Sequence, residues 1–181
     1  FSFWGNAMAK KVTLARSRLL AYFPRFVVYL AILHSIAVTL QLNETSANFI
    51  QQYLALTVEK VVRFLGYPIT VHANNLMDPT TFRYVVVDNE CTGLLLLASV
   101  LAALLALNKS PWHKLATVLI ATGVMQLENL SRIVHLYIEM TTPNNNFDFY
   151  HLYVWQAINF VTALLVLWTL DKLFRDKTTN D

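Results

Sequence analysis

Charged residues are scarce in this sequence. They make up 14% of its 181 residues, whereas soluble domains carry about 25%, and 56% of the chain is hydrophobic. Glycine and proline are few, at 4 and 5 residues, so long flexible linkers are not expected. The single cysteine excludes an internal disulfide. No cluster of basic and aromatic residues indicates nucleic acid as a partner. The composition instead predicts one integral membrane domain in contact with lipid.

Four apolar stretches are candidates for membrane spans, and they lie at residues 26–42, 94–107, 115–138 and 151–170. A crossing helix needs roughly 20 residues, so the second stretch is short. Most Lys and Arg residues fall in segments that this arrangement places on one side of the membrane. Positive flanks mark the cytoplasmic side, so both termini are expected in the cytoplasm.

Two segments between the first and second spans are expected on the outer face. In residues 46–66 apolar side chains recur at helical spacing, and polar ones such as Gln51 and Glu59 fill the other positions, which predicts an amphipathic surface helix. Residues 69–71 and 82–87 are rich in β-branched and aromatic side chains, and turn formers such as Asn74 separate them. This pattern predicts a short β-hairpin. The predicted fold class is an all-α membrane bundle of about four transmembrane helices with these two outer elements.

The chain is expected to divide into three regions. Residues 1–25 form a basic cytoplasmic N-terminus, 26–174 the membrane domain, and 175–181 a cytoplasmic tail. Residues 1–7 precede Met8, and the following Ala9-Lys10-Lys11 resembles what comes after an ordinary translation start. We therefore expect residues 1–7 to be a non-native addition. The run 26–42 lacks a clear cleavage site, so it is expected to remain as a span.

Cys91 lies where a polar segment meets the apolar run 94–107. The start of a helix stabilises a thiolate through its partial positive charge and free N–H groups, so this position suits a reactive cysteine. The structural alternative is a small apolar side chain that fills a gap. The local sequence leaves both interpretations open.

Arg132 is a charged residue inside an expected span. Such a residue costs at least about 2.5–3.5 kcal/mol near the centre of a membrane, and usually faces a protein interior or an aqueous cavity. Snorkelling towards the outer end of the helix is the alternative. Glu128, Asn129 and His135 share its helical face, which favours a polar cavity.

His151 and His135 are both candidates for an acid–base role, since both are expected near the outer boundary. A structural histidine at the interface is the alternative for each. Cys91, Arg132 and His151 come from three separate spans and are expected at one depth. They would supply a nucleophile, an oxyanion donor and a general acid–base group. The scattered histidines show no usual ligand spacing, so no metal is expected.

Three short motifs, in this order and at matching topology, resemble the exosortase/archaeosortase family of membrane transpeptidases, the short exosortase H branch most of all. They are Cys91-Thr92-Gly93, Asn129-Leu130-Ser131-Arg132-Ile133 and His151-Leu152-Tyr153-Val154-Trp155-Gln156. The resemblance covers roughly residues 20–175. It implies Cys91 as the nucleophile, His151 as its acid–base partner and Arg132 as the transition-state stabiliser. It also implies a bacterial inner membrane and no metal or other cofactor.

The substrates that the resemblance implies are exported proteins with a C-terminal sorting motif, a transmembrane helix and a basic tail. Some members are thought to pass the product to a cell-surface acceptor. The outer helix and hairpin would form the wall that reads the motif. Thr92 stands where relatives often carry Ser, Ala or Asn, and Glu128 is not typical of the family. Glu128 would either hold Arg132 in place or partly neutralise it.

Two other functions fit the same residues. A membrane thiol protease that only hydrolyses its substrate would use every residue named above. A non-enzymatic membrane binding or assembly subunit would use the polar stripe only to join helices, with Cys91 buried and inert. Detection of an acceptor adduct on the product separates the first from a transpeptidase, and rapid alkylation of Cys91 from outside counts against the second.

Overall fold

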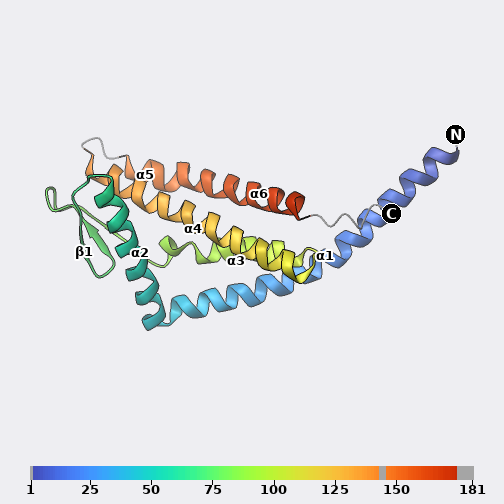
Figure 1. The fold of residues 1–181 in the computed structure, drawn as a ribbon, viewed down its shortest axis with the longest axis horizontal. Helices are drawn as coiled ribbons and strands as arrows, with labels where there is room; N and C mark the ends of the chain where they lie inside the picture. Colours follow the sequence, from blue (N-terminus) through green and yellow to red (C-terminus); the bar gives the residue numbers. More distant parts are fainter. Residues whose placement is uncertain (1, 143–145, 175–181) are drawn as a thin grey trace.

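The computed structural model describes residues 2–142 and 146–174, with side chains described from residue 20 onward. Most of this part of the chain is helical. Its elements are α1 (Ser2–Leu42), α2 (Glu44–Phe64), β1 (Thr70–His72), β2 (Asn75–Met77), β3 (Tyr84–Val86), the 3₁₀-helix η1 (Glu90–Thr92), α3 (Leu94–Ala106), α4 (Pro111–Thr141), α5 (Phe147–Phe149), the π-helix η2 (Tyr150–Val154) and α6 (Trp155–Leu173). Figure 1 shows α4 and α6 running side by side, with α3 between α4 and α1. Helix α2 and the strands gather at one end.

Helix α1 is much longer than the span predicted within it. It begins at Ser2, includes Pro24, and its N-terminal part extends beyond the other helices (Figure 1). Within the described residues, the segments 20–42 and 147–173 are long and apolar enough to cross a membrane, and α3 is a shorter apolar helix. Helix α4 has the length, at 31 residues, but it carries Glu128, Arg132 and Glu139. The arrangement of four spans therefore stays a prediction, and the tail 175–181 lies outside the described residues.

Two apolar cores hold the described elements together. One joins α2 and the strands to the second half of α4, through fully buried Val58, Leu76 and Tyr137. The Tyr137 hydroxyl donates a hydrogen bond of 2.6 Å to the Pro68 carbonyl, which ties α4 to the start of the sheet segment. The other core joins α3, α4 and α6, with Leu104 among its most buried members. Full burial of one such aliphatic side chain contributes about 1.5–3 kcal/mol to the free energy of unfolding.

The prediction of an amphipathic helix before the strands is confirmed by α2. Leu54, Val58 and Val62 are buried on one face, while Tyr53 is 64% exposed on another. The prediction that Gln51 lies on the exposed polar face of this helix is wrong, because the residue is only 8% exposed. It is buried because its amide has hydrogen-bond partners inside the protein, described below.

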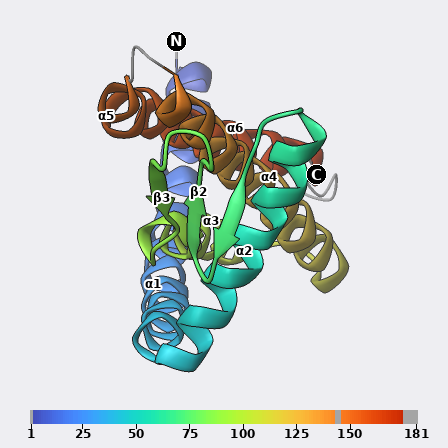
Figure 2. The same cartoon turned by 90° about the vertical axis from the view of Figure 1, so that its left-hand side faces the viewer.

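The predicted hairpin is wrong in topology, since the structure has a three-stranded antiparallel sheet in the order β1-β2-β3. Strand β2 occupies the segment that was expected to be the turn. Leu76, at its centre, is fully buried and fixes which side of the strand faces the core. The turn between β1 and β2 shrinks to Ala73 and Asn74, and Ala73 takes a φ of 55°. Figure 2 shows β3 at one edge of this sheet.

Cys91 does not lie in the first turn of the long apolar helix, as its position in the sequence suggested. It belongs to the separate 3₁₀-helix η1, and α3 begins three residues later at Leu94. Gly93 stands between the two helices with a φ of 67°, the left-handed conformation that glycine adopts readily. The backbone therefore changes direction after Cys91, and the thiol is not stabilised by the N-terminus of α3 in the way the sequence predicted.

Candidate active site

The loop that carries Cys91 is fixed by bonds to its backbone. The Cys91 N–H donates to the Asp88 carboxylate at 3.0 Å, and the Asn129 amide of α4 donates to the Cys91 carbonyl at 2.8 Å. The Sγ atom lies 3.8 Å from the Val86 carbonyl of β3, which it faces as a weak donor. The side chain is half-buried. Cys91 is thus held by α4 at its carbonyl and faces the end of β3 with its thiol.

Gly93 and Thr92 allow this loop to approach α4 closely. A Cβ atom at Gly93 would lie 3.1 Å from Cγ of Asn129, so a larger residue would push the amide away from its bond to Cys91. Thr92 is 2% exposed, and its hydroxyl donates to the Asn89 carbonyl at 2.7 Å. These residues shape the backbone on either side of the turn rather than contact the thiol.

An amide network that the sequence did not reveal supports the same loop. Gln41 of α1 donates to the Asn89 carbonyl at 3.0 Å, and Gln51 of α2 donates to the Asn89 side chain at 2.9 Å. Asn74 in the β1–β2 turn donates to Gln51 at 3.1 Å and to the Val87 carbonyl at 3.0 Å. The one sequence feature that could have indicated this network was Gln41, an amide side chain at the end of an apolar span. The other contacts join residues far apart in the sequence.

Arg132 lies inside the protein and reaches the Cys91 loop. It is 7% exposed, and its Nη2 donates to the Glu90 carbonyl at 3.2 Å. Its Nε is also buried and has no hydrogen-bond partner among the described residues. Such a donor costs about 1–3 kcal/mol when it is left unpaired, so it is available for an oxygen that enters the site.

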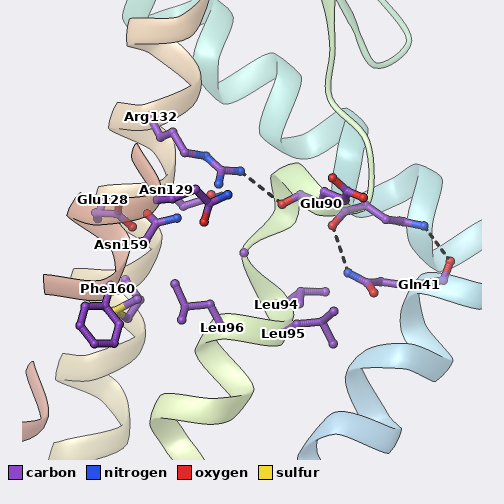
Figure 3. Close-up of a pocket in the computed structure, with 14 residues that line it drawn as sticks. Gln41, Glu90, Leu94, Leu95, Leu96, Glu128, Asn129, Arg132, Asn159 and Phe160 are labelled. Atoms are coloured by element: carbon purple, nitrogen blue, oxygen red, sulfur yellow. Dashed lines mark hydrogen bonds between the residues drawn. The ribbon is translucent and has the colours of Figure 1, made fainter. Parts of the chain in front are cut away.

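A cavity of about 420 Å³ lies beside this arginine, between the start of α3 and the helices α4 and α6 (Figure 3). Its lining is apolar on the α3 side, whereas the α4 and α6 side combines polar residues with Met125 and Phe160. It comprises Gln41, Asn89, Glu90, Gly93, Leu94, Leu95, Leu96, Met125, Glu128, Asn129, Arg132, Gln156, Asn159 and Phe160. Cys91 does not line it, although Glu90 and Gly93 on either side of it do.

Glu128 was expected either to hold Arg132 in place or to neutralise it in part, and the structure gives its carboxylate a hydrogen-bond partner on another helix. Among the described contacts no ion pair joins the two. Asn159 of α6 faces Glu128 instead, and its amide nitrogen, in the orientation that satisfies both groups, donates to Oε2 at 3.1 Å. Figure 3 shows Asn159 beside Glu128, with Arg132 turned towards Glu90. Asn159 was a polar residue in an apolar span that sequence reasoning passed over, whereas Gln156 was noted only as the last residue of the third motif.

The thiol of Cys91 is in an environment that favours its neutral form. Burial raises the pKa of the Cys91 thiol, and the negative charge of Asp88 acts in the same direction. A hydrogen bond to the Asp88 backbone and, to a smaller extent, the positive charge of Arg132 oppose this increase in the pKa without cancelling it. A nucleophilic role for Cys91 therefore needs a base to remove its proton.

His151 lies in η2, at the start of the helical segment that ends with α6. Its ring is 5.4 Å from the ring of Phe147, and Phe147 packs against the same core as Cys91. Within the described part of the chain, no hydrogen bond or ring contact joins His151 to Cys91 or Arg132. A π-helical turn is rare and often marks a functional site, which is consistent with the functional role predicted for His151.

His135 forms contacts that connect α4 to the start of α6. Its Nδ1 accepts a hydrogen bond of 3.3 Å from the Trp155 indole, and its Nε2 lies 3.9 Å from the Glu139 carboxylate. The Tyr150 ring meets its ring edge-on at 4.8 Å. These contacts favour a structural role. Among the described residues, no group of three or more His, Cys, Asp or Glu side chains is placed to hold a metal ion.

The chain matches a known protein family. A family model described as transmembrane exosortase matches residues 6–169, which includes every motif discussed above. Searches of curated proteins and of solved structures gave no match.

Proposed function

The chain belongs to the transmembrane exosortase family, and on this premise we propose that it is a membrane cysteine transpeptidase that cleaves the C-terminal sorting signals of exported proteins. The product passes to a cell-surface acceptor. The observation that carries the proposal is a buried Arg132 that bonds to the Cys91 loop at the Glu90 carbonyl and whose Nε has no partner within the described residues. A donor of this kind suits an oxyanion that forms next to a nucleophile.

The site faces the outer side of the bacterial inner membrane in this proposal, and both termini lie in the cytoplasm. Helices α1, α3, α4 and α6 provide the four crossings. The support is the charge distribution along the chain and the apolar character of 20–42, 94–106 and 147–173. The substrate's own transmembrane helix then lies beside the bundle, so that its sorting motif reaches η1 from the membrane.

The reaction begins at the thiol. His151 accepts the proton of Cys91, and the thiolate attacks the scissile carbonyl carbon to form a C–S bond. The oxyanion that results accepts hydrogen bonds from Arg132, which is always charged and therefore cannot act as the base. His151 returns the proton to the departing amine as the C–N bond breaks, which leaves a thioester on Cys91.

The second half of the reaction releases the enzyme. An amine or hydroxyl of the acceptor attacks the thioester, and the thiol leaves with a proton returned through His151. Water in the place of the acceptor would make the protein a hydrolase with the same residues. Mass spectrometry of the new C-terminus separates the two, because a transpeptidase leaves an adduct on it and a hydrolase leaves a free carboxylate.

The proposal is tested with a secreted reporter that ends in a sorting tail from the same organism, produced in cells without another exosortase. The chain is expected to shorten the reporter, and Cys91→Ala is expected to leave it at full length. Arg132→Gln should reduce processing by about 10²–10³-fold, the usual loss for an oxyanion donor. Ser131→Ala is the matched control, since this neighbouring side chain is exposed and bonds only to its own helix. Full processing by Cys91→Ala would exclude Cys91 as the nucleophile.

A further inference from the structure

The backbone of β3 has one side bonded and one side free. At one end of the β2–β3 ladder, the Asp78 N–H donates to the Arg83 carbonyl at 2.9 Å. At the other end, the Val87 N–H donates to the Asn74 carbonyl, also at 2.9 Å. The backbone groups of an antiparallel strand point alternately to its two sides. Every second residue from Arg83 to Val87 therefore bonds towards β2, and the residues between them point the other way.

Tyr84 and Val86 are the residues that point away from β2. Their N–H and C=O groups lie on the outer edge of the sheet, because β3 is its last strand (Figure 2). In the part of the chain that the structure describes, no further strand pairs with β3 on this side, and both residues are exposed, Tyr84 at 64% and Val86 at 42%. Within the described residues, the one contact to these backbone groups comes from Cys91, whose Sγ lies 3.8 Å from the Val86 carbonyl.

The position of the thiol matches the position of an added strand. Neighbouring strands lie about 4.7–4.9 Å apart. A peptide paired with β3 would therefore occupy the space into which the backbone N–H and C=O groups of Tyr84 and Val86 point. Sγ of Cys91 already lies in that space, opposite Val86. A peptide that bonds to Tyr84 therefore meets the thiol at the next backbone position along the same edge.

A groove of about 440 Å³ lies beside β3. It is lined by Phe82, Arg83, Tyr84, Val85, Met140, Phe147 and Asp148. Phe147 lines the groove, and its ring centroid lies 5.4 Å from that of His151. The aromatic and aliphatic lining suits one apolar side chain of an extended peptide, with alternate side chains pointing away from it.

We propose that the polypeptide substrate binds as an added β-strand on the free edge of β3, with its scissile bond at Cys91 and a neighbouring side chain in this groove. The inference rests on the proposed function for the nature of the substrate. It adds the mode of recognition, in which backbone bonds to Tyr84 and Val86 give affinity and the groove gives selectivity. An occupant without a peptide backbone would leave the alternating N–H and C=O groups of this edge unpaired.

Proline at position 84 tests the backbone bond. Tyr84→Pro removes the outward N–H and places a ring in the path of the added strand, whereas Tyr84→Ala removes the same side chain and keeps the N–H. Proline is tolerated on an edge strand when its N–H would face outward. We expect Tyr84→Pro to process the reporter at least about tenfold more slowly than Tyr84→Ala, since one hydrogen bond contributes about 1 kcal/mol and the ring adds a steric block. Equal rates for the two variants would overturn the proposal.

Photo-crosslinking supplies a measurement that does not depend on turnover or on the proline variant folding. The photoreactive residue p-benzoylphenylalanine replaces Tyr84 in one sample and Tyr53 in the other, both with Cys91→Ala and the reporter tail. Tyr53 is the matched control, because it is also 64% exposed but lies on α2. The tail should crosslink from position 84 and not from position 53. Crosslinking from 53 instead, or from neither, overturns the strand-addition proposal.

The failure of this inference differs from the failure of the proposed function. If the chain with native Cys91 cleaves the reporter but position 84 gives no crosslink, the transpeptidase proposal stands and the strand-addition proposal falls. If position 84 crosslinks the tail and the chain with native Cys91 does not cleave it, the tail binds at β3 and the chemistry proposed for Cys91 is wrong.

Discussion

Gly93→Ala perturbs the candidate site through two separable effects. The first is backbone strain, because Gly93 has a φ of 67° and a left-handed conformation costs other residues roughly 1–2 kcal/mol. The second is contact, because the new Cβ would lie 3.1 Å from Cγ of Asn129, and carbon atoms prefer about 3.5–4.0 Å. Asn129 would have to move away from the Cys91 carbonyl, to which its amide now donates at 2.8 Å.

The expected magnitude follows from these two effects. Loss of the bond between Asn129 and Cys91 removes about 1 kcal/mol, so Gly93→Ala should lower the free energy of unfolding by about 2–3 kcal/mol in total. Gly66→Ala is the matched control. Gly66 has a φ of 86°, but a Cβ there would meet nothing within 4 Å. It should therefore show the strain alone, about 1–2 kcal/mol.

Thermal unfolding of the purified protein in detergent measures the difference. For a chain of this length, 1 kcal/mol corresponds to about 2–4 °C in Tm, so Gly93→Ala should unfold that much below Gly66→Ala. Reporter processing gives the second readout. We expect it to fall with Gly93→Ala and to persist with Gly66→Ala, because only the first substitution displaces the loop that carries Cys91.

A double-mutant cycle decides whether the contact is real. Asn129→Ala removes the amide that the new Cβ would displace, so combined with Gly93→Ala it should cost about 1 kcal/mol less than the sum of the single variants. Additive effects would refute the contact, and equal losses for the two glycine variants would refute the idea that Gly93 is under more constraint than Gly66.

Three further predictions concern the thiol, the histidines and the amide network. Because burial raises the pKa of Cys91 and the thiolate is the reactive form, its alkylation rate should rise with pH to a midpoint above the ordinary thiol value of about 8.5; a plateau by pH 8 would contradict this. His151→Ala should reduce processing by about 10²–10⁴-fold without changing Tm, whereas His135→Ala loses its bond to Trp155 and should lower stability by about 1 kcal/mol. Gln51→Leu leaves buried amide partners unpaired and should destabilise the protein by about 1–3 kcal/mol in thermal unfolding; an unchanged Tm would show that the network is not needed.

Local pattern was enough to predict those parts of the fold that depend on residues close in the sequence. The apolar repeat of α2 identified Leu54 and Val58 as core residues, because helical spacing places them on one face. The face shared by Glu128, Asn129, Arg132 and His135 indicated a polar cavity, and the first three residues do line one. His135 does not line it and contacts Trp155 instead. The strand β2 escaped prediction because three residues are too few to show a period of two. Its one informative residue, Leu76, is surrounded by turn formers.

Long-range contacts explain most of what the sequence could not predict. The burial of Gln51 depends on Asn74 and Asn89, and nothing within α2 indicates either partner. The preference of Glu128 for Asn159 over Arg132 depends on how α6 packs against α4. A partner four residues away on the same helix competes with any better partner that tertiary packing supplies. The local sequence shows only the partner on the same helix.

One unfavourable feature lies beside the Cys91 loop, and it favours function over pure stability. Arg132 has a buried Nε with no partner among the described residues, and such an unpaired donor costs about 1–3 kcal/mol. A sequence selected only for stability would remove it. The feature becomes favourable if a peptide carbonyl at Cys91 becomes an oxyanion, because Arg132 then gains its partner only as the charge forms. Stabilisation that appears only at that stage lowers the barrier without strengthening substrate binding.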